Sequence, residues 1–129
     1  MIIAHSEETR YLARFSNGIH TAQVDATLEN GGHNAAFRPH DLLEAALASS
    51  LNLWLRIQAD KRGYPLEAVS TQVVVDRDDA EQTTFRYVVE LLGAELTAEQ
   101  RQDLLSIVTQ TPVKNTLSKP IQFVRQDAL

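Results

Sequence analysis

The sequence predicts an α+β domain built mostly from antiparallel sheet. Strand-like stretches occur in pairs joined by short turns, a long amphipathic helical segment separates the first pair from the second, and another helical segment follows. A doubly wound parallel sheet would instead alternate single strands with helices. The predicted order is therefore ββ-α-ββ-α-β, and the length fits one domain over residues 1–129.

The first pair is predicted to be a β-hairpin. Residues 10–15 and 19–28 contain strand-forming side chains and flank a Ser-Asn-Gly turn at 16–18. An Asn-Gly pair between two such stretches is a strong hairpin signal, because both residues tolerate positive φ angles. The following residues, 29–39, are rich in Asn and Gly and are predicted to form a loop.

A long helix is predicted to begin at Pro39 and to end near Gly63. Pro39 suits the first helical turn, where its missing N–H is not needed, and Asp41 is favourable at the positive end of the helix dipole. Gly63 can adopt the left-handed conformation that ends a helix, and Pro65 prevents its continuation. A wide apolar face is formed by Leu42, Leu43, Ala46, Leu47, Leu53, Trp54 and Ile57.

The second half of the chain repeats the pattern of a hairpin followed by a helix. Residues 68–76 and 83–92 are rich in Val, Thr, Phe and Tyr, which favours two strands joined by a charged turn. Thr97 with a Gln three residues later predicts a capping box at the start of a helix that Pro112 stops or breaks. Residues 121–125 are predicted to form a closing strand.

Composition excludes several functional classes. The net charge is −5 and no Lys/Arg cluster stands out, so nucleic acid is not expected as a partner. No segment approaches the roughly 18 uncharged residues of a membrane-spanning helix, and Glu7 and Glu8 lie where a signal peptide would be apolar. A cytoplasmic protein is therefore predicted. The chain has no cysteine, which excludes disulfides and thiol catalysis.

No metal or cofactor is expected. The four histidines are scattered, and none forms a metal-binding pair at helical spacing. The acidic turn that contains Asp78, Asp79 and Glu81 lacks the alternating oxygen ligands and the glycine of a calcium loop. This turn is interpreted as a solvated hairpin tip.

Two adjacent hydroxyls, Ser49 and Ser50, interrupt the apolar stretch LEAALASSLNLWL. The structural interpretation is that Ser50 is a small packing residue whose hydroxyl donates to the carbonyl of Ala46 one turn back. A nucleophilic serine would need a base within hydrogen-bond reach. His40 lies ten residues earlier, roughly 15 Å along a helix axis, so only a base from elsewhere or from a second subunit could serve. A Gly-X-Ser-X-Gly elbow is also missing.

The stretches PHDLLEAALASSLNLWLRIQADKRGYPLEAVSTQVVV and QTPVKNTL resemble the OsmC/Ohr superfamily of osmotically induced and organic hydroperoxide resistance proteins. The most specific features are Pro39 placed eleven residues before Ser50, the Gly-Tyr-Pro-Leu run after the helix, and the Pro-Val-X-X-Thr-Leu segment. The resemblance covers nearly the whole chain. It implies an intertwined homodimer with central helices between sheets and two active sites at the subunit interface.

The resemblance also implies a thiol chemistry whose residues this chain lacks. Similar proteins reduce organic hydroperoxides with a peroxidatic cysteine, whose position falls on Ser50, and a resolving cysteine, whose position falls on Thr111. The helper acid falls on His40, and a basic or histidine position falls on Lys114. The active-site arginine has no clear equivalent, since Arg38, the nearest candidate, lies at the wrong spacing.

A thiol peroxidase passes through sulfenic acid and disulfide states that a hydroxyl cannot reach. The first hypothesis is therefore a non-peroxidase that binds a small apolar or peroxide-like molecule in the interface pocket. The alternatives are an organic hydroperoxide reductase, if Ser50 is an engineered replacement of cysteine, an enzyme of another kind that uses Ser50 or His40, or a purely structural or partner-binding role. The predicted pocket residues are Ser50, Leu51, Leu53, Trp54, Thr111, Val113 and Lys114, with His40 as a further polar group.

Overall fold

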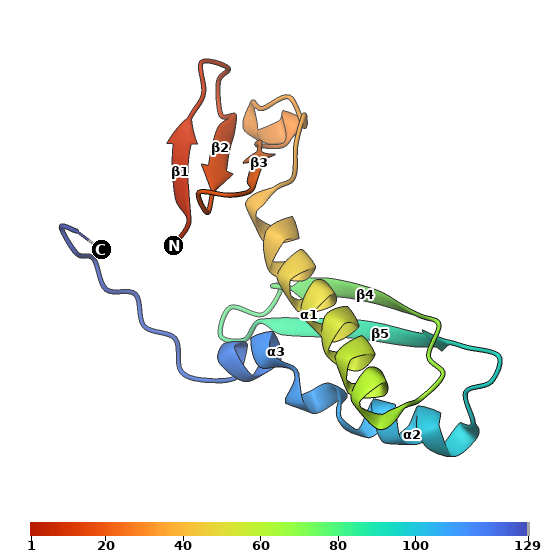
Figure 1. The fold of residues 1–129 in the computed structure, drawn as a ribbon. Helices are drawn as coiled ribbons and strands as arrows, with labels where there is room; N and C mark the ends of the chain where they lie inside the picture. The colour runs from red at the N-terminus through yellow and green to blue at the C-terminus, as the bar shows by residue number, and fades with distance from the viewer. Residues whose placement is uncertain (129) are drawn as a thin grey trace. The chain divides into compact units, whose positions relative to one another are not determined.

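The computed structural model describes residues 1–128 and forms two compact units, which meet in sequence within one helix, between Ala45 and Ala46. The elements are shown in Figure 1 and follow the order β1 (Ile3–Ser6), β2 (Ala13–Ser16), β3 (Thr21–Val24), η1 (Leu28–Asn30), α1 (Pro39–Arg62), β4 (Ala68–Asp76), β5 (Thr84–Leu92), α2 (Ala98–Ser106), η2 (Val108–Gln110) and α3 (Pro112–Leu117).

The first unit contains a three-stranded antiparallel sheet in the order β1-β2-β3. The predicted hairpin is confirmed as β2 and β3, with Ala13 opposite Val24 and Gly18 in the turn at φ 93°. The Asn17 side chain closes this turn by accepting the backbone N–H groups of Ile19 and His20. β1 lies outside the predicted strands. All four of its residues are exposed, so no buried face imposes an alternating pattern on the sequence.

A buried carboxylate organises the loop that leads to α1. Asp25 is 2% exposed and accepts the backbone N–H groups of Ala26 at 2.8 Å, His33 at 3.1 Å and Ala35 at 3.0 Å. These hydrogen bonds, led by the one from Ala35, hold the pKa of Asp25 below its ordinary value. Gly32 packs so closely here that a Cβ atom would lie 2.1 Å from the Ala26 carbonyl oxygen.

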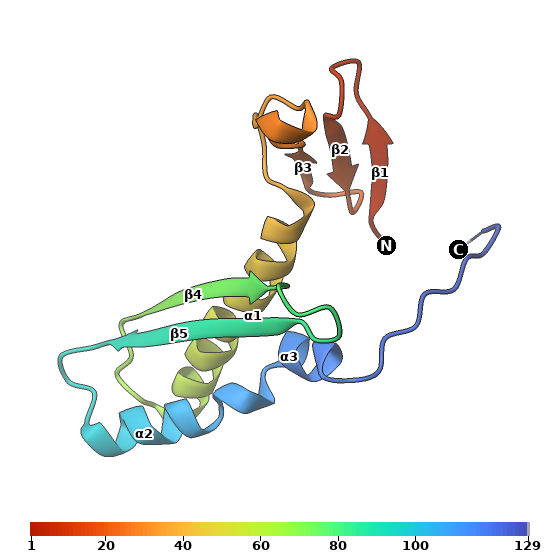
Figure 2. The ribbon, with the colours of Figure 1, turned by 180° about the vertical axis from the view of Figure 1, so that it is seen from behind.

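The second unit is built on the β4–β5 hairpin, which pairs without a bulge from Ala68 opposite Leu92 to Asp76 opposite Thr84. The two predicted strands are thus confirmed almost to the residue. Figures 1 and 2 show the part of α1 in this unit covering one face of the hairpin. That face presents Val69, Val73, Phe85 and Val89 to the core.

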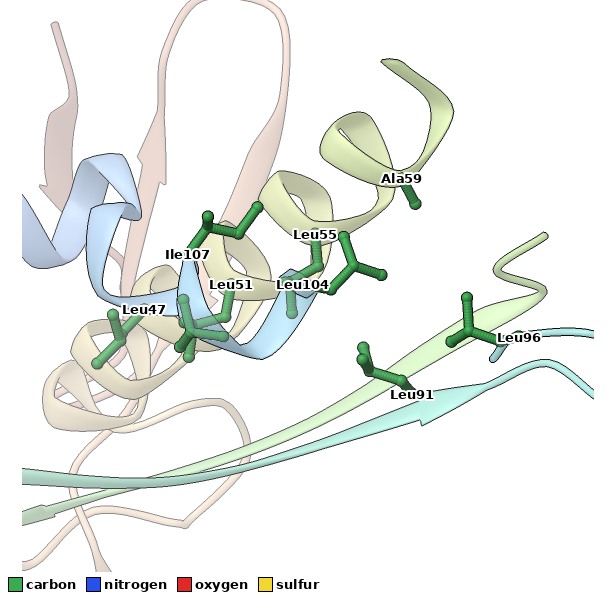
Figure 3. Close-up of a cluster of buried hydrophobic side chains, with 9 residues drawn as sticks. Leu47, Leu51, Leu55, Ala59, Leu91, Leu96, Leu104 and Ile107 are labelled. Carbon is green, nitrogen blue, oxygen red and sulfur yellow. The ribbon is translucent and has the colours of Figure 1, made fainter. Parts of the chain in front are cut away.

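The core of the second unit is formed by one row of α1 side chains packed against residues from β5 and the segments that follow it. The row recurs every four residues, which keeps it on one side of the helix. Figure 3 shows this cluster, which consists of Leu47, Leu51, Leu55, Ala59, Leu91, Leu96, Leu104, Ile107 and Val108.

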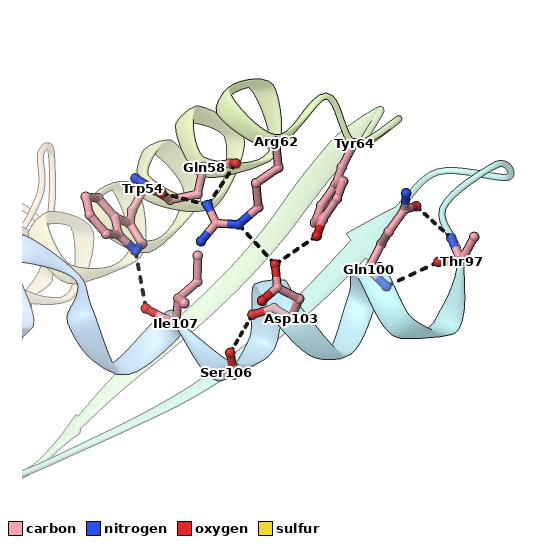
Figure 4. A network of polar contacts seen from close by, with 9 residues as sticks. All are labelled: Trp54, Gln58, Arg62, Tyr64, Thr97, Gln100, Asp103, Ser106 and Ile107. Carbon is pink, nitrogen blue, oxygen red and sulfur yellow. Dashed lines mark hydrogen bonds and ion pairs between the residues drawn. The ribbon is translucent and has the colours of Figure 1, made fainter.

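The predicted caps are present at the C-terminal end of α1 and at the N-terminal end of α2. α1 ends before Gly63, whose φ is 65°, and α2 begins with the complete capping box of Thr97 and Gln100. Figure 4 shows that Arg62 and Tyr64 converge on Asp103 of α2. The Arg62 Nε atom lies 3.0 Å from the Asp103 carboxylate, and the Tyr64 hydroxyl donates to the same carboxylate at 3.1 Å. These contacts tie the end of α1 to α2.

Two predictions for the C-terminal part require correction. Pro112 does not stop the second helix, since α2 already ends at Ser106 and η2 follows it. Pro112 instead begins α3, where its fixed φ suits the first turn. The closing strand predicted over residues 121–125 is wrong: these residues have no regular secondary structure. Phe123 is 95% exposed and Val124 73% exposed, and within residues 1–128 no strand pairs with them. Strand propensity alone does not form a strand without a hydrogen-bonding neighbour.

Candidate functional site

A groove of about 460 Å³ runs along α1 in the second unit. Its volume lies within the range of small-molecule sites. The α1 residues of the lining recur at three- and four-residue spacing and therefore share one helix face. The groove is lined by Ala46, Ser49, Ser50, Leu53, Trp54 and Ile57 of α1 and by Pro112 and Val113 of α3. Apart from the two hydroxyls and the Trp54 indole N–H, these side chains are hydrocarbon.

Ser50 joins α1 to α3 in the wall of this groove. Its half-buried hydroxyl accepts the backbone N–H of Val113 at 3.4 Å. Thr111, the residue that precedes α3, makes no side-chain cap to the helix, so Ser50 satisfies one of the N–H groups that a helix start leaves open. The bond predicted from Ser50 to the Ala46 carbonyl is wrong. Ser49 donates to that carbonyl at 3.3 Å, whereas the Ser50 hydroxyl contacts α3.

Thr111 has a different environment from Ser50. Its side chain is fully buried, and its hydroxyl donates to the Val108 carbonyl oxygen at 2.6 Å. This contact matches the interpretation of Thr111 as a residue that satisfies backbone groups at a helix end. Thr111 is not among the residues that line the groove, which differs from its expected place in the pocket.

The remaining predicted pocket residues divide between the groove and the core. Trp54 lines the groove while its indole N–H donates to the Ile107 carbonyl at 3.2 Å, as Figure 4 shows. Leu53 lines the groove and is 54% exposed. Leu51 does not line it, since its side chain is fully buried in the core cluster. Lys114 is also outside the lining, and its ammonium donates to the Thr109 carbonyl at 3.4 Å.

Arg38 and His40 belong to the first unit and are both exposed. Arg38 forms an ion pair with Asp41 at 2.6 Å, and this hydrogen-bonded contact holds the pKa of Asp41 below its ordinary value. His40 is the second residue of α1, a helix that runs without interruption past Ser50. Ten residues of helix correspond to about 15 Å along the axis. Within one chain, His40 therefore cannot hydrogen bond to the Ser50 hydroxyl.

Several groove residues are missing from the predicted pocket. Ala46, Ser49, Ile57 and Pro112 line the groove without having been singled out as pocket residues. The three that lie on α1 could have been found from helical spacing. Ala46 stands four residues before Ser50 and Ile57 seven after it, and Ser49 stands four residues before Leu53. Pro112 carries no such signal, since its place depends on how α3 packs.

No group of three His, Asp or Glu side chains in the described part of the chain is placed to hold a metal ion. Among the helices of residues 1–128, none combines the length and apolar character needed to cross a membrane.

Comparison with known proteins identifies one family. The family described as OsmC-like protein matches residues 32–124, a range that contains α1, the β4–β5 hairpin and the whole groove. A comparison with curated proteins finds no significant match.

Solved structures share the fold at low sequence identity. The organic hydroperoxide resistance protein OsmC of Legionella pneumophila is 19% identical over 92% of this chain and 89% of its own, with a TM-score of 0.64. An OsmC-like protein of Mycoplasma pneumoniae is 16% identical over 91% and 85%, with a TM-score of 0.74. A Vibrio cholerae organic hydroperoxide resistance protein with captopril bound in one of its active sites is 17% identical over 92% and 84%, with a TM-score of 0.64.

Proposed function

This chain belongs to the OsmC-like protein family, and from that premise we propose that it binds a small apolar or peroxide-like molecule in the groove along α1 without reducing hydroperoxides. One observation carries the proposal. Ser50, which stands where the family resemblance implies a peroxidatic thiol, lies in the wall of an apolar groove. The site thus keeps a ligand-sized space while its reactive atom is an oxygen.

The chemistry of the two hydroxyl positions supports the loss of peroxidase activity. A peroxidatic thiolate attacks the O–O bond, becomes a sulfenic acid and is then converted to a disulfide by a second thiol. The Ser50 oxygen has no such series of oxidation states. Thr111, at the position implied for the second thiol, is buried and donates its hydrogen bond to the Val108 carbonyl.

Two observations support ligand binding in the groove. Its lining is mainly hydrocarbon, so an apolar molecule would be transferred from water into a matching environment. The structurally similar Vibrio cholerae protein holds captopril in one of its active sites, and this supports the proposal that the present chain also binds a small molecule.

We further propose that the chain works as a homodimer, as the family resemblance implies, and in the cytoplasm, as its sequence predicts. Large apolar side chains that do not line the groove are also exposed in the second unit, among them Phe123 and Val124. An apolar surface of this kind usually marks an interaction site. A second copy of the chain would cover part of it.

The first experiment measures consumption of an organic hydroperoxide in the presence of a dithiol reductant. The protein is expected to consume no more peroxide than a control without protein. The double variant Ser50→Cys with Thr111→Cys tests whether the same pocket supports the reaction once both thiols are restored. Clear turnover by the unmodified chain would contradict the absence of peroxidase activity.

The second experiment is a thermal-shift screen with lipid-like and peroxide-like compounds at high concentration. A ligand present at a hundred times its Kd stabilises the folded state by about 2.7 kcal/mol, which shifts the melting temperature measurably. If no compound raises the melting temperature, the binding proposal is wrong.

A further inference from the structure

Resting on the proposed function, we infer that the groove selects a linear alkyl molecule with a single uncharged hydroxyl head over the corresponding carboxylate. The inference concerns which molecule binds, whereas the proposed function states only that an apolar molecule does. It follows from the order of polar and apolar groups along α1 and from the hydrogen-bonding state of each polar atom in the lining.

The two hydroxyls of the groove lie together on α1, and a longer apolar stretch follows them on one side. Only Ala46 of the lining precedes Ser49 and Ser50 on α1, whereas Leu53, Trp54 and Ile57 follow them toward the C-terminal end of the helix. Seven residues separate Ser50 from Ile57, which corresponds to about 10 Å of helix. An extended alkyl chain of medium length can lie along this stretch with its polar head beside the serines.

The Ser50 hydroxyl is suited to a neutral head group. Its oxygen accepts the Val113 N–H, and within residues 1–128 no protein acceptor takes its own proton. That O–H is therefore available to a ligand oxygen. The Trp54 indole N–H is not available in this way, because it already donates to the Ile107 carbonyl. A single ligand hydroxyl matches a single available donor.

A carboxylate head would fit this lining poorly. None of the eight lining residues carries a charged side chain. Moving an ionised group from water to such a surface is costly unless an opposite charge or several hydrogen bonds compensate for the lost hydration. An alcohol loses far less hydration and recovers it with one hydrogen bond to Ser50. Charge complementarity thus favours the alcohol.

The test uses decanol and decanoate, which share one alkyl chain and differ in their head group. Trp54 is the only tryptophan of the chain and lines the groove, so its fluorescence reports binding at this site directly. Titrations of the full chain at pH 7 are expected to give a Kd for decanol at least about tenfold lower than that for decanoate.

Three variants locate the head group. Ser50→Ala is expected to weaken decanol binding about fivefold, because it removes the O–H that the ligand hydroxyl would accept. Ser49→Lys places an ammonium at the hydroxyl-bearing part of the groove and is expected to tighten decanoate binding about fivefold or more. Ser106→Ala, an exposed serine on α2 whose hydroxyl donates to the Asp103 carbonyl, is the control and should change neither affinity. Circular dichroism of each variant verifies its folding.

The outcomes separate the inference from the proposed function. Equal affinities, or tighter binding of decanoate by the unmodified chain, would overturn the selectivity while leaving ligand binding intact. If neither compound changes Trp54 fluorescence or the melting temperature, ligand binding itself fails and the inference fails with it. A fluorescence change that follows protein concentration alone would show that a second copy fills the groove, which also overturns the inference.

Discussion

Ser50 and Thr111 occupy the two positions at which the family resemblance implies cysteines, and their surroundings give the two hydroxyls different roles. Ser50 is half-buried, contacts α3 and borders a groove, whereas Thr111 is fully buried and bonded to the carbonyl of Val108. A group at the position of Ser50 can meet a ligand. The Thr111 side chain instead hydrogen bonds to the local backbone, so we expect its replacement to change the free energy of unfolding.

Replacing Thr111 with valine tests that assignment. Valine preserves the shape of the buried side chain but removes the hydroxyl that donates at 2.6 Å. We expect the free energy of unfolding to fall by about 1 kcal/mol, the usual net contribution of one buried hydrogen bond. Urea denaturation measures this change. The matched control is Thr109→Val at an exposed position, which should stay within about 0.5 kcal/mol of the unmodified chain.

Asp25 predicts a pH dependence for the first unit. Its folded-state pKa lies below the ordinary value of 3.8, so its stabilising contribution is complete above the unfolded-state pKa. The contribution is lost as the pH falls below about 5 and passes through the lowered folded-state pKa. Thermal unfolding measured between pH 7 and about pH 3 should therefore show a smaller loss on acidification for Asp25→Asn than for the unmodified chain.

The Asp25→Asn variant should already be less stable at pH 7. The carboxylate accepts three backbone N–H groups with two oxygens, whereas an amide has only one acceptor oxygen. Asp60→Asn on the exposed face of α1 is the control. If both variants follow the same pH profile, the role given to Asp25 is wrong.

At the scale of elements, the parts predicted correctly are those whose chemistry is local. α1, α2, β4 and β5 carry caps, a terminating Gly and patterned side chains within their own residues. β1, α3 and residues 121–125 depend on neighbours. β1 needs β2 to become a strand, α3 forms where Pro112 can begin a helix, and residues 121–125 lack a partner strand.

For the candidate site as well, only part of the lining could be predicted from the sequence. The resemblance placed Ser50 along α1, and Leu53, Trp54 and Val113 do line the groove with it. It did not predict the rotation of each side chain. Leu51 follows Ser50 directly, but at 3.6 residues per turn it lies about 100° further round the helix and enters the core. Lys114 does not line this groove either, because its ammonium donates to the Thr109 carbonyl.

The end of α1 gives a test of an element boundary. Gly63 has a φ of 65°, and a Cβ atom there would contact nothing within 4 Å, so a substitution adds backbone strain without a clash. Gly63→Ala is expected to lower the free energy of unfolding by about 1 kcal/mol. Gly63→Asn should lower it less, because Asn tolerates this conformation better than Ala. Chemical denaturation of both variants checks the order, and equal losses would contradict it.

At the scale of the whole molecule, the exposed apolar side chains support association. We expect sedimentation equilibrium to give a mass twice the 14.4 kDa of the chain. Phe123→Asp should shift the equilibrium toward single chains, since it puts a charge on a 95% exposed aromatic position. Gln122→Asp adds the same charge at the neighbouring polar residue and is the matched control. A single-chain mass for the unmodified protein would contradict the proposed dimer.

The absence of sulfur from the groove lining determines how such a site would be used. A thiol consumes its substrate and must be regenerated by a reductant after every cycle, so its capacity is set by electron supply. A groove of hydroxyls and hydrocarbon returns its ligand unchanged, and its occupancy follows mass action alone. The amount of bound ligand would therefore depend on the concentrations of protein and ligand and would not depend on the redox state of the cell.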